Sequence, residues 1–137
     1  MNKRILTAAA ILLAFSVPAL AAGKYPLTEL FTTDKTIVDE PLAYPAGQAE
    51  VQAAIVTLAP GEETPMHKHG VPLFAYILEG EVTVDYGSHG KKVYKQGDSF
   101  MEAMAVDHVG RSTGTVPVKI LAVYMGAKGA ENVIKSK

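Results

Sequence analysis

GEETPMHKHGVPLFAYILEG, residues 61–80, is the stretch of sequence that decides the fold and the chemistry of this chain. Pro60-Gly61 and Gly80 bound it as turns, and Leu73-Phe74-Ala75-Tyr76-Ile77 within it has the apolar and aromatic composition of a strand. His67 and His69 are two residues apart, so on a strand both imidazoles project from the same face. The stretch therefore predicts two histidines that point into one space.

Further strands are predicted on both sides of this stretch. The chain has apolar, β-branched or alternating runs at 48–58, 72–78, 82–86, 91–95, 99–104 and 116–125, separated by Gly turns. Short strands at regular spacing with almost no helix indicate an antiparallel sandwich or barrel. We expect one all-β barrel over residues 49–126, after an N-terminal arm (22–48) that carries an edge strand at 36–38. Residues 127–137 are predicted to be a polar tail, disordered or a short helix.

The first residues have the pattern of a secretory signal peptide. Lys3 and Arg4 precede the apolar run 5–17, and Pro18-Ala19-Leu20-Ala21 ends in a small-residue cleavage site. The run is shorter than the ~20 residues of a membrane-spanning helix. We therefore expect cleavage near Ala21, a secreted or periplasmic protein, and no membrane association of the mature form.

Charge and cysteine content exclude several classes of partner and site. Removing Lys3 and Arg4 from the 13 basic residues leaves 11 against 14 acidic residues, a net charge of −3. This balance argues against nucleic acid as a partner. The chain has no cysteine, so a metal site here must use His, carboxylate, Met or Tyr.

A third histidine, His108, follows a later Gly-led strand. Three neutral imidazoles that converge on one pocket are a metal site in outline. The competing interpretation is an exposed loop pair at 67 and 69 and a turn residue at 108. His89 lies in a predicted hairpin loop and is expected to be solvated. Met66, Met101, Met104 and Met125 suggest copper, although core packing is the commoner role of methionine.

The spacing of these glycines and histidines resembles the two motifs of the cupin superfamily. Gly61, His67, His69 and Gly80 fit the first motif, and Gly97 and His108 fit the second. The resemblance covers about 51–125. It implies a double-stranded β-helix (jelly-roll) barrel with one divalent transition metal (Fe, Mn, Ni, Cu or Zn), a small-molecule ligand or substrate, and a homodimer.

The chain departs from the cupin motifs at three places. Leu73 stands where the first motif has a metal-binding Glu, Ala103-Met104-Ala105 replaces Pro-x-Gly, and Ser112 replaces the final Asn. The implied metal ligands are therefore His67, His69 and His108, with Glu102 as an additional candidate.

A substrate pocket is expected from apolar and aromatic residues on the flanking strands. The candidates are Phe74, Tyr76, Phe100, Met104 and Tyr124.

Three functions fit these residues. The first is an exported metal-dependent dioxygenase, decarboxylase or isomerase that acts on a small oxygenated molecule. The second is a non-catalytic periplasmic cupin that binds a metal or a small ligand, an alternative favoured by Leu73. The third is a metal-free structural barrel. The chain has no Gly-x-Ser-x-Gly elbow, phosphate-binding loop or dinucleotide fingerprint.

Overall fold

The computed structural model describes residues 25–136, so the predicted signal peptide and its cleavage site near Ala21 lie outside the described residues. The described chain consists of strands and one short 3-10 helix, η1 (Gly87–His89). The strands are β1 (Ala49–Leu58), β2 (His67–Lys68), β3 (Leu73–Glu79), β4 (Glu81–Asp85), β5 (Lys91–Lys95), β6 (Ser99–Met101), β7 (Val109–Ser112), β8 (Val118–Ala127) and β9 (Ile134–Lys135). No helix in this part of the chain is long and apolar enough to cross a membrane.

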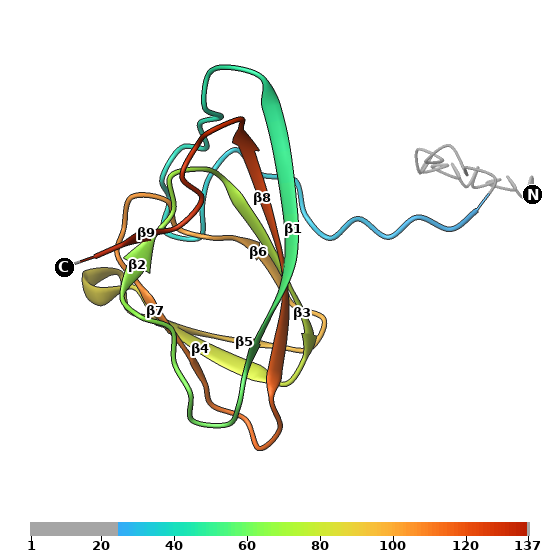
Figure 1. The fold of residues 1–137 in the computed structure, drawn as a ribbon. Coiled ribbons are helices and arrows are strands. Elements are labelled where there is room, and N and C mark those ends of the chain that lie inside the picture. Colours follow the sequence, from blue (N-terminus) through green and yellow to red (C-terminus); the bar gives the residue numbers. More distant parts are fainter. Residues whose placement is uncertain (1–24, 137) are drawn as a thin grey trace, which may run out of the picture.

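The strands form three antiparallel sheets that enclose a common interior (Figure 1). One sheet has the order β1-β8-β3-β6, a second has the order β5-β4-β7, and β2 pairs with β9. Strand pairs far apart in sequence hold the barrel together, above all β1 with β8 over ten residue pairs. This arrangement confirms the predicted all-β jelly-roll barrel.

Alternation along the strands places one apolar face of each main sheet inside the barrel. On β3, Leu73, Ala75 and Ile77 are buried, and on β4 the same holds for Val82 and Val84. The interior is continuous between the two sheets. Its further buried members are Tyr86, Tyr94, Phe100, Val118, Ala122 and Tyr124.

The N-terminal arm differs from the prediction at residues 36–38, which form a tight turn instead of an edge strand. The Thr36 hydroxyl accepts the Glu40 amide at 3.1 Å, and Thr36 and Glu40 also pair through their backbones at 2.8 Å. Asp39 completes the turn with a φ of 66°. The turn joins the barrel through the Ile37 amide, which donates to the Met101 carbonyl at 2.8 Å. Short polar side chains that bond to their own backbone compete with strand pairing, which explains the difference.

The described part of the C-terminal tail, residues 127–136, also differs from the prediction, because it contains a paired strand and no helix. β8 continues to Ala127, and β9 returns to pair with β2, with His67 opposite Lys135 and Lys68 opposite Ile134. A two-residue strand is too short to produce a periodic pattern, so nothing in the sequence indicated it.

The turn between β3 and β4 depends on Gly80. Its φ is +78°, and a Cβ at this position would lie 2.7 Å from the Pro117 carbonyl oxygen. Gly97 has a similar φ of +93°, but a Cβ there would meet nothing within 4 Å.

We predict that Gly80→Ala destabilises the barrel by about 2–4 kcal/mol and Gly97→Ala by only about 1–2 kcal/mol. Both variants adopt an unfavourable backbone conformation, and only the first also forces two chain segments apart. Urea denaturation of the two variants and the parent measures the difference. Equal losses in the two variants would show that the close approach to Pro117 contributes nothing.

Candidate metal centre

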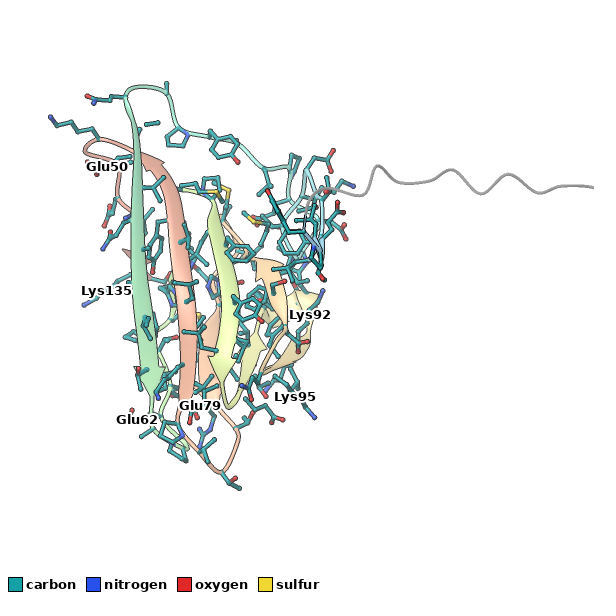
Figure 2. The ribbon with its side chains drawn as sticks, turned by 90° about the vertical axis from the view of Figure 1, so that its right-hand side faces the viewer. Glu50, Glu62, Glu79, Lys92, Lys95 and Lys135 are labelled. Carbon is teal, nitrogen blue, oxygen red and sulfur yellow. The ribbon has the colours of Figure 1, made fainter. Side chains whose placement is uncertain are left out.

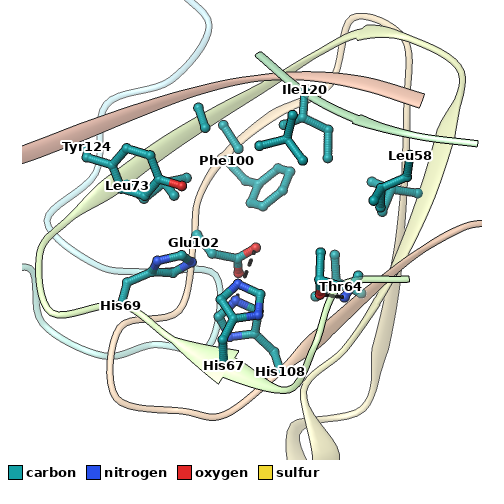
Figure 3. A pocket seen from close by; sticks show the side chains of 16 residues that line it. Leu58, Thr64, His67, His69, Leu73, Phe100, Glu102, His108, Ile120 and Tyr124 are labelled. Carbon is teal, nitrogen blue, oxygen red and sulfur yellow. Dashed lines mark hydrogen bonds and ion pairs between the residues drawn. The ribbon is translucent and has the colours of Figure 1, made fainter. Parts of the chain in front are cut away.

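Three histidines from two neighbouring segments meet at one side of the barrel interior (Figure 3). His67 begins β2, His69 lies just beyond its end, and His108 precedes β7 and bridges to His67 through the backbone. One ring nitrogen from each lies within 4.8 Å of the others. The structure therefore brings together the three histidines that the sequence singled out. His89, in η1, is exposed.

The hydrogen bonds of the three rings fix which nitrogen faces the centre. Each Nδ1 contacts a backbone carbonyl oxygen: Pro65 for His67 (2.8 Å), Asn132 for His69 (3.0 Å) and Val106 for His108 (2.9 Å). A carbonyl oxygen can only accept, so each Nδ1 donates its proton and each Nε2 keeps a free lone pair. Carbonyl partners on the outer nitrogen are the usual support of metal-binding histidines.

The Nε2 atom of His108 is buried and has no hydrogen-bond partner in the described structure. A buried polar atom without a partner costs about 1–3 kcal/mol. A metal ion held by the three Nε2 atoms would satisfy this atom together with its neighbours. The donor set and the buried, unpartnered nitrogen both fit a metal.

Burial keeps the three imidazoles neutral. Together with the nearby His108 and His67, it lowers the pKa of His69 to about 4, against an opposing hydrogen bond to Asn132. Burial also lowers the pKa values of His67 and His108. Metal ions bind the neutral form of histidine, so the site is in the binding form at neutral pH.

Glu102 follows β6 directly, and its carboxylate reaches the edge of the histidine cluster. Its Oε2 lies 3.9 Å from Nε2 of His108, and its Oε1 accepts the Ala103 amide at 2.8 Å. Only 7% of the residue is exposed, and this burial raises the pKa of Glu102 to about 7, against an opposing interaction with the Tyr86 hydroxyl. Glu102 lies outside the set of mutually close ligand atoms. It is therefore placed beside the centre, in reach of a bound ion or of a molecule on it.

An apolar cavity of about 80 Å³ opens from the histidines into the barrel. Leu73, the residue at the motif's Glu position, forms part of its wall. A space of this size holds a molecule of only a few heavy atoms, since one water needs roughly 10–15 Å³ on the same measure. The other apolar lining residues are Val56, Leu58, Ala75, Val82, Val84, Phe100, Ile120, Ala122 and Tyr124.

Two of the five predicted pocket residues, Phe100 and Tyr124, line this cavity, and three do not. Phe74 and Tyr76 alternate with the inward-facing residues of β3 and therefore take its outer face, where Phe74 packs against Phe31 with ring centroids 5.8 Å apart. Met104 lies in the loop after β6, where its amide donates to the Glu40 carboxylate at 2.7 Å.

The methionines that suggested copper are absent from the lining of the cavity. Met66, Met101, Met104 and Met125 all lie outside it. These positions argue against a thioether ligand at the centre. A packing role fits Met101, which is 6% exposed, but not Met66, which is 48% exposed.

Two residues beside the histidines, Tyr86 and Asn132, were not predicted from the sequence. Tyr86 is 1% exposed, its ring lies 5.6 Å from that of His108, and its hydroxyl is 3.1 Å from the Tyr94 hydroxyl. Alternation along 82–86 could have placed Tyr86 inside. Asn132 supports His69 through its backbone, and a backbone carbonyl leaves no signal in a sequence.

A family model for the cupin domain matches residues 54–124, just over half of the chain. Among curated proteins none matches. The similar solved structures include a Lactobacillus farciminis oxalate decarboxylase in complex with formate (TM-score 0.55, 22% identity). They also include a DMSP lyase from Ruegeria pomeroyi (0.55, 22%) and a polyketide cyclase from Streptomyces resistomycificus (0.52, 17%).

The shared regions cover 64%, 63% and 67% of this chain, but only 27%, 43% and 63% of the decarboxylase, the lyase and the cyclase. The chain thus spans less than two thirds of each of these proteins. At this identity the likeness establishes the fold alone.

The raised pKa of Glu102 predicts a pH-dependent stability of the metal-free protein. The carboxyl ionises at 4.5 in an ordinary environment and at about 7 in the fold. As the pH rises from 4.5 to 7, the unfolded chain loses this proton and the folded chain keeps it, so the contribution of Glu102 to stability falls across this window and levels off above it. The lowered pKa values of the three histidines act in the opposite direction over the same range, so the Glu102 effect is read from the difference between variant and parent. The shift corresponds to about 3 kcal/mol.

Glu102→Gln, which removes this ionisation, is therefore expected to gain about 3 kcal/mol relative to the parent between pH 4.5 and 7. Denaturant unfolding in the presence of a chelator measures the gain at each pH. Glu50→Gln, at an exposed position on β1, is the matched control. A constant difference between Glu102→Gln and the parent at all pH values would contradict the burial of an ionisable carboxyl here.

Proposed function

The chain belongs to the cupin family, and from that premise we propose that it binds one divalent transition metal through His67, His69 and His108 and acts there on a small oxygenated molecule. The observation that carries the proposal is the convergence of three imidazole nitrogens within 4.8 Å, each with its Nδ1 tied to a backbone carbonyl.

Three imidazole ligands suit Fe, Mn, Ni, Cu or Zn. When bound, such a metal keeps coordination positions open and polarises an oxygen of the substrate as a Lewis acid. The unpartnered Nε2 of His108 supports this assignment, because a metal removes the cost of leaving it buried.

The chain's own residues supply the other parts of the chemistry. Leu73, Phe100 and Ile120 make the walls apolar. Glu102 has a pKa near neutrality, the range in which a carboxyl can both give and accept a proton. A proton donor and acceptor beside the centre supports decarboxylation or isomerisation of a small carbonyl or carboxyl compound. With iron bound, a dioxygenase remains the alternative enzyme class.

The second candidate is a cupin that binds a metal or a small ligand without catalysis. The supporting observation is Leu73, which stands in the cavity wall where the family motif has a carboxylate ligand. The similar structures include a decarboxylase, a lyase and a cyclase, so the shared fold favours no single reaction.

Export is retained as part of the proposal, supported by the Lys-Arg, apolar and Ala-Leu-Ala pattern of residues 1–21. The mature protein would then meet metals in an extracytoplasmic compartment.

Elemental analysis of the untagged mature protein is expected to find close to one metal ion per chain. A His67→Ala/His108→Ala variant is expected to lose it, because one imidazole cannot hold the ion. His89→Ala, which removes the exposed fourth histidine, is the control and should retain the metal. Equal trace metal in parent and double variant would overturn the proposed site.

Turnover on a panel of small keto acids, diketones and thiols then separates the two candidates. Full metal content without turnover on any of them would favour the binding protein.

We also propose that the protein is a homodimer, supported by exposed apolar residues on the outer face of the β1-β8-β3-β6 sheet, the sheet that faces the viewer in Figure 2. On β1, Val51 and Ile55 are 66% and 61% exposed. Large apolar side chains gathered on one side of a molecule are typical of an interaction surface.

Ile55→Glu is therefore expected to convert a dimer to a monomer in a light-scattering measurement of mass. Val93→Glu changes an equally apolar exposed residue on β5, in the opposite sheet, and should leave the dimer intact. A monomeric parent would contradict the proposal directly.

A further inference from the structure

The last residues of the chain form a strap across one end of the barrel. This C-terminal strap, residues 128–136, begins at a turn in which the Ala130 amide donates to the Ala127 carbonyl at 2.8 Å. It then runs through Asn132 into β9, which lies beside β2 (Figure 1). None of these residues belongs to the region that matches the cupin family model.

The strap accepts a hydrogen bond from one of the three histidines, whereas the other two histidines have partners close to them in the sequence. His67 and His108 each donate to a carbonyl two residues earlier in their own segment. His69 donates to the carbonyl of Asn132, 63 positions away in the sequence. The tautomer and direction of His69 therefore depend on where the strap lies.

Contacts with three parts of the barrel hold the strap in place. The Asn132 side-chain amide donates to Oε1 of Gln52 on β1 at 2.6 Å. Ser136 donates through its amide to the Met66 carbonyl at 3.1 Å, and its hydroxyl bonds the Asp107 carboxylate. The strap thus touches the residues next to His67 and His108 as well as His69 itself.

The closest approach is at Gly70, directly after His69. A Cβ at this position would collide with the Glu131 carbonyl oxygen. Only a glycine leaves room for the strap here, so the backbone of 131–132 is set against the backbone that carries His69.

The strap also forms part of a second cavity, of about 200 Å³, that adjoins the metal centre. Val133 and Lys135 line it from the strap, and His67 and Tyr124 line both this cavity and the inner one. Displacing the strap would therefore remove a wall of the site as well as the partner of His69.

We propose that the C-terminal strap is a positioning element of the metal centre, in which the Asn132 carbonyl holds His69 with Nδ1 protonated and Nε2 directed at the ion. The inference rests on the metal centre proposed above and assigns its third ligand to a support outside the common cupin region. Loss of such an outer partner typically weakens metal affinity about 10- to 100-fold.

Two variants displace the strap by different means. Truncation after Ala127 removes it, and Gly70→Ala pushes Glu131 and Asn132 away while keeping all residues of the strap. In titrations of the chelator-treated protein with Zn²⁺ alone, both are expected to bind about 10- to 100-fold more weakly than the parent. Glu131→Ala, which changes an exposed side chain of the same segment, should bind as the parent does.

A second measurement needs no metal. Nitrogen NMR of the metal-free protein, labelled on its histidine rings, is expected to show His69 as the pure Nδ1–H tautomer in the parent and in Glu131→Ala. In Gly70→Ala and in the truncated chain, the same ring should show a mixture of the two tautomers. His67 and His108, with local partners, should stay in the Nδ1–H form throughout.

Together, the two measurements distinguish a failure of the proposed metal centre from a failure of the strap inference. A parent that binds no Zn²⁺ overturns the metal centre. Unchanged Zn²⁺ affinity together with an unchanged His69 tautomer in Gly70→Ala overturns the strap inference alone. If the truncated chain does not fold, which circular dichroism reveals, Gly70→Ala decides the question.

Discussion

The main constraint on this structure is that three imidazole rings, each with a free nitrogen lone pair, are enclosed in an apolar interior. Such a group is costly to bury without partners, and here each ring donates a hydrogen bond from Nδ1 to a backbone carbonyl and turns its free nitrogen toward the other two. The three carbonyls come from the loop before β2, the loop before β7 and the C-terminal strap. The barrel brings these three segments to one point, so the candidate metal centre depends on the strand pairing of the fold.

The carboxyl group of Glu102 adds an ionisable acidic side chain to a site that otherwise consists of neutral imidazoles. It lies across from His108 with Tyr86 behind it, and burial keeps its proton near the midpoint of ionisation at neutral pH. Leu73 leaves the first motif without its carboxylate, and Glu102 enters the same cavity from β6. The chain thus has an acidic group beside the centre although the motif position for the usual one is occupied by Leu73.

The sequence predicted those features that depend on the alternation of apolar residues and on the intervals between motif residues. Alternation identified the strands, and the intervals from Gly61 to His69 and from Gly97 to His108 identified the histidines that converge. It failed for Phe74 and Tyr76, since an apolar run of five residues leaves undecided which face points inward. It also failed for residues 36–38, where side-chain hydrogen bonds replace strand pairing, and for the strap, whose main contact is a backbone carbonyl.

The position of Ser136 beside Met66 has a practical consequence for handling the protein. An affinity tag or fusion partner added at the C-terminus would begin two residues after Ser136, next to β2 and its histidine. A polyhistidine tag there would place extra imidazoles at the mouth of the site, where they would compete for the ion and raise the metal measured per chain. From Tyr25, the described chain begins as an arm that extends away from the barrel (Figure 1), so a tag attached ahead of this arm would lie farther from the three histidines.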